Sequence, residues 1–259
     1  MGSSGNRILY RGVYKLAAVK NERGGYIYLP AGFPFSSGAA AMPGYEIVHA
    51  LFRRPVPWRD GFTTIEKRFD AESRPKQALC GVELRCPAPM TPDGFHQFNI
   101  GYRAILEEWD IIVDGVNPVG RTNVSPVRNP PNETLMYGFS YTVESADISA
   151  TFCGAGGGET SENGNVSEGD MSQEGMRKKA ARVMEIMMER LSGLGMTWKD
   201  VTDVNVYTAA QNGDWLAAEL LPHMAGDEVH GVRWYLSRPP IIGLDFEMDL
   251  RGYRQKFWL

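Results

Sequence analysis

The chain has 259 residues, of which 43% are hydrophobic and 22% charged, and its 27 basic and 31 acidic residues give a net charge of −4. This composition is typical of a globular protein, and no run approaches the roughly 18 apolar residues of a membrane-spanning helix. The acidic balance argues against a partner held through nucleic-acid phosphates. We therefore expect neither a membrane nor a nucleic acid as partner.

The cysteines and histidines carry no metal-site or disulfide pattern. There are three cysteines, an odd number without CxxC spacing, and four histidines without HxxxH or HxH spacing. The N-terminus also lacks the apolar core and small-residue cleavage site of a secretory signal. We expect a cytoplasmic protein with no structural disulfide and no metal site.

The first half of the chain alternates strand and helix signals. Apolar residues at spacings of three and four predict helices, and alternation of apolar with small or polar residues predicts a half-buried strand. In chain order, the expected elements are strand 25–29, helix 62–69, strand 78–84, helix 95–109, the run NPVGRTN at 117–123 and strand 137–143.

The second half repeats this order. The glycine-rich segment 154–169 has no apolar periodicity and predicts a mobile loop. The remaining expected elements are a helix over 180–194 stopped by glycines, strand 200–208, helix 215–221, the run GVRWY at 231–235 and strand 244–250. The repetition predicts two tandem domains, 1–145 and 146–259, with the loop at about 154–169 in the second.

Several local phrases, in this order, resemble the Rid (YjgF) family of enamine/imine deaminases. The stretch 176–208 is similar to that family's long helix, glycine stop and following strand, and GLDFEMDL at 243–250 is similar to its acidic last strand. NPVGRT resembles the Pro-x-x-Arg phrase that carries the substrate arginine. The resemblance implies an α+β fold of two chorismate mutase-like domains, each a mixed sheet with two helices on one face, and assembly as a homotrimer.

The resemblance also implies a site built around arginines. Arg121 and Arg233 take the place of the arginine that binds the substrate carboxylate, a role for which the planar guanidinium is well shaped. The alternative for each is an ordinary ion pair at a strand edge. Asp245 matches the family's water-handling carboxylate, with Glu247 as a second candidate, although acids alternating along a strand are more often its solvated face.

Other matches are weaker and include departures from the family pattern. Tyr14, in a phrase similar to Gly-Pro-Tyr, and Gly32, with its counterpart Gly156, lie where the family contacts its ligand. Asn123 and Tyr235 stand where active members often have cysteine, so either half alone is an incomplete deaminase.

The resemblance implies a cofactor-independent deaminase that hydrolyses a small enamine or imine bearing a carboxylate, such as aminoacrylate or aminomuconate. Two other functions stay open at this point. One is a non-catalytic protein of the same fold that binds small carboxylates, and the other is a chorismatase-like enzyme. Retention of both arginines favours a carboxylate ligand in every case.

Overall fold

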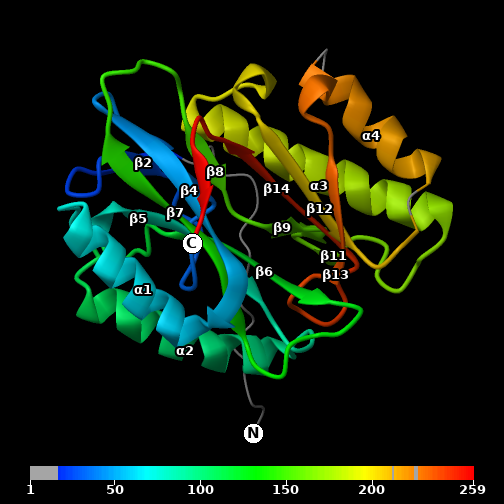
Figure 1. The fold of residues 1–259 in the computed structure, drawn as a ribbon. Coiled ribbons are helices and arrows are strands. Elements are labelled where there is room, and N and C mark those ends of the chain that lie inside the picture. The colour runs from blue at the N-terminus through cyan, green and yellow to red at the C-terminus, as the bar shows by residue number, and fades with distance from the viewer. Residues whose placement is uncertain (1–16, 212, 225–226) are drawn as a thin grey trace, which may run out of the picture.

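The computed structural model describes residues 17–211, 213–224 and 227–259, and the described residues build a mixed α+β fold around one large sheet (Figure 1). The α-helices are α1 (Trp58–Ala71), α2 (Pro92–Glu108), α3 (Gln173–Leu194) and α4 (Asp214–Met224). Short 3-10 turns are η1 (Lys76–Ala78), η2 (Trp198–Asp200) and η3 (Asp227–His230). No helix of the described residues is long and apolar enough to cross a membrane.

The strands of the first half are β1 (Val19–Asn21), β2 (Tyr26–Tyr28), β3 (Gly38–Ala41), β4 (Tyr45–Pro57), β5 (Leu79–Arg85), β6 (Gly120–Pro126) and β7 (Leu135–Glu144). Those of the second half are β8 (Phe152–Gly154), β9 (Gly157–Gly158), β10 (Thr160–Ser161), β11 (Gly164–Asn165), β12 (Asp203–Thr208), β13 (Arg233–Arg238), β14 (Phe246–Gly252) and β15 (Lys256–Trp258).

The predicted helices and most predicted strands are confirmed, with shifted ends. The glycine stop is Gly195, which caps α3 with a φ of 73° in the left-handed region that glycine tolerates best. The long strand β4 was not predicted, because its sequence follows a stretch rich in glycine and proline. The glycine-rich segment 154–169 contains the short strands β9, β10 and β11.

The two halves exchange their terminal strands within one sheet. Its path runs β1-β2-β3-β8-β14-β12-β13-β6-β5-β7-β4-β15, with β9 paired to β14. The N-terminal strands β1 to β3 therefore extend the second half through the β3–β8 pair, and β15 extends the first half beside β4 (Figure 1). The α+β class is confirmed, whereas the division into two Rid-like domains stays a prediction.

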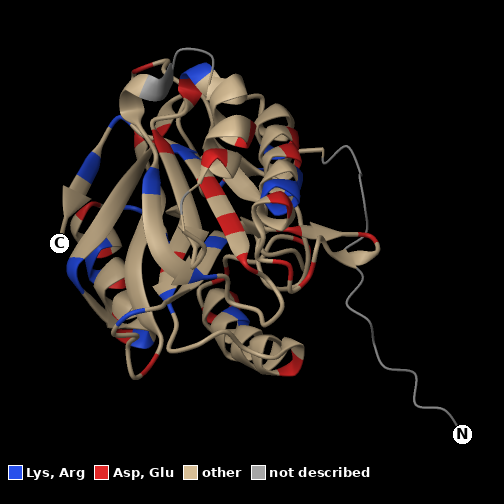
Figure 2. Cartoon of the chain, turned by 90° about the vertical axis from the view of Figure 1, so that its right-hand side faces the viewer, with Lys and Arg blue, Asp and Glu red and all other residues tan. Residues whose placement is uncertain are grey.

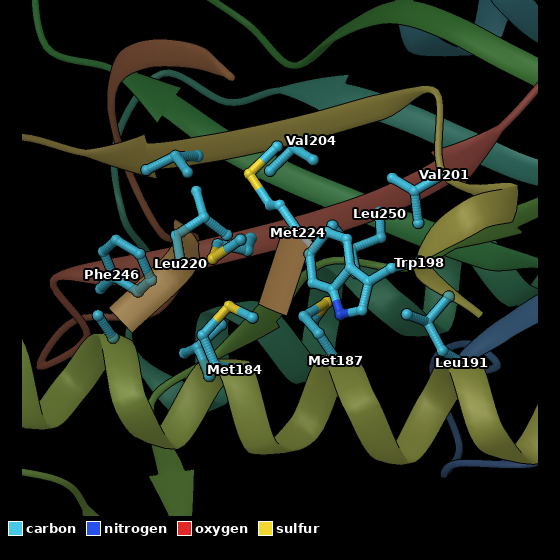
Figure 3. Packing of buried hydrophobic residues seen from close by; sticks show 14 of the residues in the cluster. Met184, Met187, Leu191, Trp198, Val201, Val204, Leu220, Met224, Phe246 and Leu250 are labelled. Atoms are coloured by element: carbon cyan, nitrogen blue, oxygen red, sulfur yellow. The ribbon is translucent and has the colours of Figure 1, made fainter. Parts of the chain in front are cut away.

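Each half has its own apolar core beneath its pair of helices. In the second half, α3 and α4 cover the apolar side of β12 and β14, where Met187, Trp198 and Phe246 belong to one buried cluster (Figure 3). In the first half, α1 and α2 cover β5 and β7, and the ring of Phe62 packs against that of Tyr102. This arrangement buries the apolar stripe of every helix against one sheet face.

The opposite face of the sheet is polar and is also buried. Arg251 of β14 binds Asp249 through two hydrogen bonds of 2.9 Å and contacts Glu83 of β5 at 2.5 Å, so it joins the two halves. Although burial works in the other direction, Arg251 and His49 together lower the pKa of Glu83. The apolar side chains of β7 and β14, such as Phe139 and Phe246, pack against helices, so they need no neighbouring subunit to cover them. The homotrimer stays a prediction.

Candidate active site

A pocket lies where the two halves meet at β6. The first half contributes β6 and the ring of Phe95 from α2, and the second half contributes α3, β14 and the turn Gly156 to Gly158. The pocket forms because β13 pairs with β6 only near its end, through Ser237 and Arg238. The earlier residues of β6 are instead approached by the turn, whose Gly156 N–H donates to the Arg121 carbonyl at 3.1 Å.

Arg121 is one of the predicted site residues, and it lines this pocket. Only 2% of it is exposed. Its Nη2 donates to Asn99 Oδ1 of α2 at 2.5 Å, and its guanidinium lies 4.4 Å from the ring centre of Tyr102. Phe35 and Phe95 also lie within cation-π range. Apolar rings around a guanidinium lower the local dielectric, which strengthens a charge-assisted contact made there.

Asn123 lines the same pocket two residues along β6, on the same face of the strand. It is buried, yet neither its amide nitrogen nor its amide oxygen has a hydrogen-bond partner among the described residues. Buried polar groups of folded proteins are nearly always hydrogen-bonded. An unsatisfied amide beside the arginine is therefore suited to binding a polar ligand.

Glu247 of β14, also predicted from the sequence, forms the other side of the pocket. It is 4% exposed. Burial and the neighbouring Asp249 raise its pKa well above the ordinary value, against the opposing charge of Arg190. A carboxyl group in this state holds its proton at higher pH than a solvated one and can donate it.

Gly156 explains how Glu247 reaches the pocket. A β-carbon at this position would overlap Glu247 Oε1 and would lie 3.2 Å from Thr122 Cγ2. The position therefore requires glycine, because the turn passes directly over the carboxyl group. The resemblance had indicated Gly156 as a point where the backbone approaches the ligand, and that role stays a prediction.

Arg190 was not predicted, and it reaches the pocket from α3. Its Nη1 donates to the Ala155 carbonyl at 2.6 Å, which fixes the start of the glycine turn. It falls three residues after Met187 and one before Leu191, both buried on the apolar stripe of the helix. A charged residue next to the apolar stripe of a helix is the feature of the sequence that could have indicated Arg190 as a site residue.

Arg233, expected to match Arg121, lies elsewhere. Its side chain is 54% exposed and forms an ion pair with Asp203, which also accepts a hydrogen bond from Lys256 at 2.6 Å. This is the strand-edge ion pair that was the alternative to a binding role. It does not line the pocket described here.

Asp245, which the sequence suggested as the acid of the same site, does not lie near Arg233. It precedes β14 and pairs with Lys179 of α3, on the helix side of the sheet. Arg233 lies opposite Asn205, and Asn205 lies opposite Asp249, so Asp245 belongs to the other end of these strands. Asp245 and Glu247 consequently point into different surroundings.

Gly32 and Tyr235, two further predicted residues, do not line the pocket. Gly32 is exposed, and a β-carbon there would meet only Pro34 at an ordinary 3.6 Å. Tyr235 stacks on Tyr207 at 5.0 Å on the polar inner face. Tyr14 lies outside the described residues.

Acidic and basic side chains are distributed over the described part of the chain. Figure 2 shows both acidic and basic residues on helices and strands alike. Among the described residues no group of three His, Cys, Asp or Glu side chains is placed to hold a metal ion.

Comparison with known proteins identifies relatives over nearly the whole chain. Residues 18–257 match the family described as 2-aminomuconate deaminase CnbZ. A 2-amino-5-chloromuconate deaminase from Comamonas testosteroni is 42% identical over 243 residues, which cover 91% of this chain and 96% of that protein. This family is distinct from the Rid family that the sequence phrases resemble, so the expected family is corrected while the expected deaminase class agrees.

Solved structures give weaker similarities. A chorismatase crystal structure is 13% identical, with a TM-score of 0.49, and covers 91% of this chain and 78% of its own. A cyanuric acid hydrolase from A. caulinodans is 10% identical, with a TM-score of 0.38, over 83% of this chain and 69% of its own. Similarities at this level say nothing about the activity of this chain.

Proposed function

Because the chain belongs to the 2-aminomuconate deaminase family, we propose that it hydrolyses the C–N bond of a 2-aminomuconate-like substrate in the pocket at the junction of its two halves. Such a substrate is a six-carbon conjugated dicarboxylate with an amino group on C2, and it is therefore an enamine. The products are the corresponding 2-oxo acid and ammonia.

The reaction balances without a redox step. A proton added to carbon converts the enamine into an iminium ion, and water adds to C2 and loses one proton to give a carbinolamine. The hydroxyl proton of the carbinolamine then passes to nitrogen as the C–N bond breaks, which leaves the 2-oxo group and releases ammonia. One water is consumed for each ammonia released, and no electrons are gained or lost overall. The proposal accordingly invokes proton transfer and no redox cofactor.

Arg121 and Asn123 are suited to hold the reacting end of the substrate. The guanidinium binds the carboxylate on C1 through its planar fork, which fixes C2 in the pocket. The amide of Asn123, buried and without partners, is placed to bind the amino group or the attacking water. Holding both reactants in position removes much of the entropic cost of the reaction.

Glu247 is suited to move the protons. Burial keeps it protonated at higher pH than an ordinary glutamate, so it donates the proton that converts the enamine to the iminium ion. The resulting carboxylate then accepts a proton from the attacking water. Arg190, whose charge opposes the rise in the Glu247 pKa, stabilises the carboxylate between these steps.

The observation that supports this proposal most is the meeting of Arg121 and Glu247 in one pocket, each from a different half of the chain. Neither half alone has both groups. A carboxylate anchor and a proton donor of raised pKa are the two functions that hydrolysis of such an enamine requires.

Ammonia release from freshly generated 2-aminomuconate tests the proposal, with Glu247→Gln as the variant and Asp245→Asn as the matched control. We expect Glu247→Gln to lower kcat by about 100- to 10,000-fold, the usual contribution of a general acid–base group. Asp245→Asn should stay within a few-fold of the wild type. No release above the uncatalysed rate by the wild type, together with binding of the unreactive diacid muconate, would instead favour the carboxylate-binding function.

A further inference from the structure

We propose that the polar inner face of the sheet holds a second carboxylate-binding site, centred on Arg85 of β5. This inference rests on the proposed function for the identity of the substrate, but the site itself is argued from the residues around Arg85. Arg85 is distinct from the residues that line the pocket at β6.

Arg85 is a buried cation whose hydrogen-bonding capacity is not used. It is 7% exposed. Its Nη1 donates to the carbonyl of Leu84 at 3.1 Å, and its buried Nη2 has no hydrogen-bond partner among the described residues. Within the same residues it forms no salt bridge. A buried guanidinium that has an unpartnered donor and no direct ion pair is unfavourable, so an anion bound here would relieve this cost.

Tyrosine rings surround this guanidinium. Its central carbon lies 4.0 Å from the ring centre of Tyr137, and 5.5 Å and 5.8 Å from those of Tyr235 and Tyr207. The three rings come from β7, β13 and β12, hence from both halves of the chain. The Tyr207 hydroxyl already donates to Asp249 at 3.0 Å, so what the three tyrosines offer a planar anion beside the cation is mainly their flat apolar faces.

The nearby acids form no ion pair with Arg85 among the described residues, although its charge contributes to the lowered pKa of Glu83. Glu83, two residues earlier on β5, is engaged by Arg251 and by His49, each at 2.5 Å. Burial raises the pKa of Glu247, and the charge of Arg85 acts on that pKa in the opposite direction. Arg85 is thus close enough to the pocket at β6 for its charge to lower the pKa of Glu247.

The guanidinium of Arg85 and the tyrosine rings around it favour a carboxylate as the bound anion. A guanidinium offers paired N–H donors to two oxygens in one plane, and the flat tyrosine rings accept a planar group. Two sources can supply it. One is the far carboxylate of the dicarboxylate substrate whose first carboxylate binds Arg121, and the other is a separate carboxylate molecule that binds beside Glu247.

Calorimetric titration with three stable probes tests the site. Muconate is the substrate skeleton without the amino group, sorbate replaces its far carboxylate with a methyl group, and acetate is a single small carboxylate. The variants are Arg85→Met and Arg121→Met, with Arg54→Met, which removes an exposed arginine of β4, as the matched control. Circular dichroism verifies folding, and Arg85→Lys replaces Arg85→Met if the latter is unfolded.

If the site takes the far carboxylate, Arg85→Met lowers muconate affinity by about 10- to 100-fold and leaves sorbate affinity unchanged. If the site at Arg85 takes a separate carboxylate molecule, acetate still binds to the Arg121→Met variant. The double variant with Arg121→Met and Arg85→Met then no longer binds acetate. The inference is overturned if no probe loses affinity in Arg85→Met, or if Arg54→Met shows the same loss. Because these titrations measure binding, a failure of ammonia release leaves their outcome unaffected.

Discussion

The strands β6 and β13 carry the two arginines that the sequence presented as counterparts, and the structure gives them different surroundings. Arg121 lies beneath α2, enclosed by aromatic rings and bonded to Asn99. Arg233 lies at the exposed start of β13 and pairs with Asp203. The register places Arg121 beside Val82 of the apolar cluster and Arg233 beside Asn205 of the polar face, so the two side chains lie on opposite faces of the sheet. Of the two, Arg121 is the one that a helix and the other half of the chain enclose in a pocket.

Replacing each arginine by alanine gives the largest contrast expected. Arg121→Ala should lower kcat/KM by about 100-fold, because a buried, charge-assisted carboxylate contact is lost. Arg233→Ala should stay within about 2-fold, since exposed ion pairs contribute little. Steady-state ammonia release measures both. A larger loss for Arg233→Ala would mean that β13 carries the active pocket.

The two predicted glycines give a second, smaller contrast. In Gly156→Ala the added methyl group overlaps Glu247 Oε1, so the carboxyl must move, and we expect turnover to fall by about 10-fold. Gly32→Ala meets only Pro34 at 3.6 Å and should leave turnover unchanged. Equal activity of the two variants would show that the position of Glu247 is not critical.

Replacing Glu159 should change turnover least. Its effect is expected in the way the free energy of unfolding depends on pH. Burial raises its pKa to about 7, against hydrogen bonds from the backbone N–H groups of Asp245 and Phe246. Because the folded state binds this proton more tightly than the unfolded state, the stabilisation is complete below about pH 4.5 and is lost as pH rises through about 7.

Urea unfolding between pH 4.5 and 8 measures this effect. Glu159→Gln should show a weaker loss of stability with rising pH than the wild type, and the exposed control Glu162→Gln should follow the wild type. Parallel curves for all three proteins would contradict the raised pKa of Glu159.

Much of the fold could be predicted from periodicity, but its connections could not. The apolar spacings located all four described α-helices, because each helix buries one stripe. The exchange of β1 to β3 and of β15 between halves depends on pairings such as Ala39 with Cys153, which are separated by more than a hundred residues. No local pattern specifies which edge such short strands join.

For the candidate site as well, local patterns predicted some residues, whereas others depend on contacts between distant parts of the chain. Arg121, Asn123 and Glu247 were found because they lie on strands with a recognisable order, and all three line the pocket. Asp245 was misplaced next to Arg233 because strand alternation gives the face of a residue and not its distance along a neighbouring strand. Arg190 and Arg85 were missed because their roles depend on contacts between the halves.

A crystal structure of the protein with bound muconate tests the central claim most directly. We predict one carboxylate on the Arg121 guanidinium, within hydrogen-bond reach of Asn123, with the adjacent carbon facing the Glu247 carboxyl group. Muconate seated at Arg233, with the pocket at β6 vacant, would contradict the assignment of the active site to the junction of the two halves.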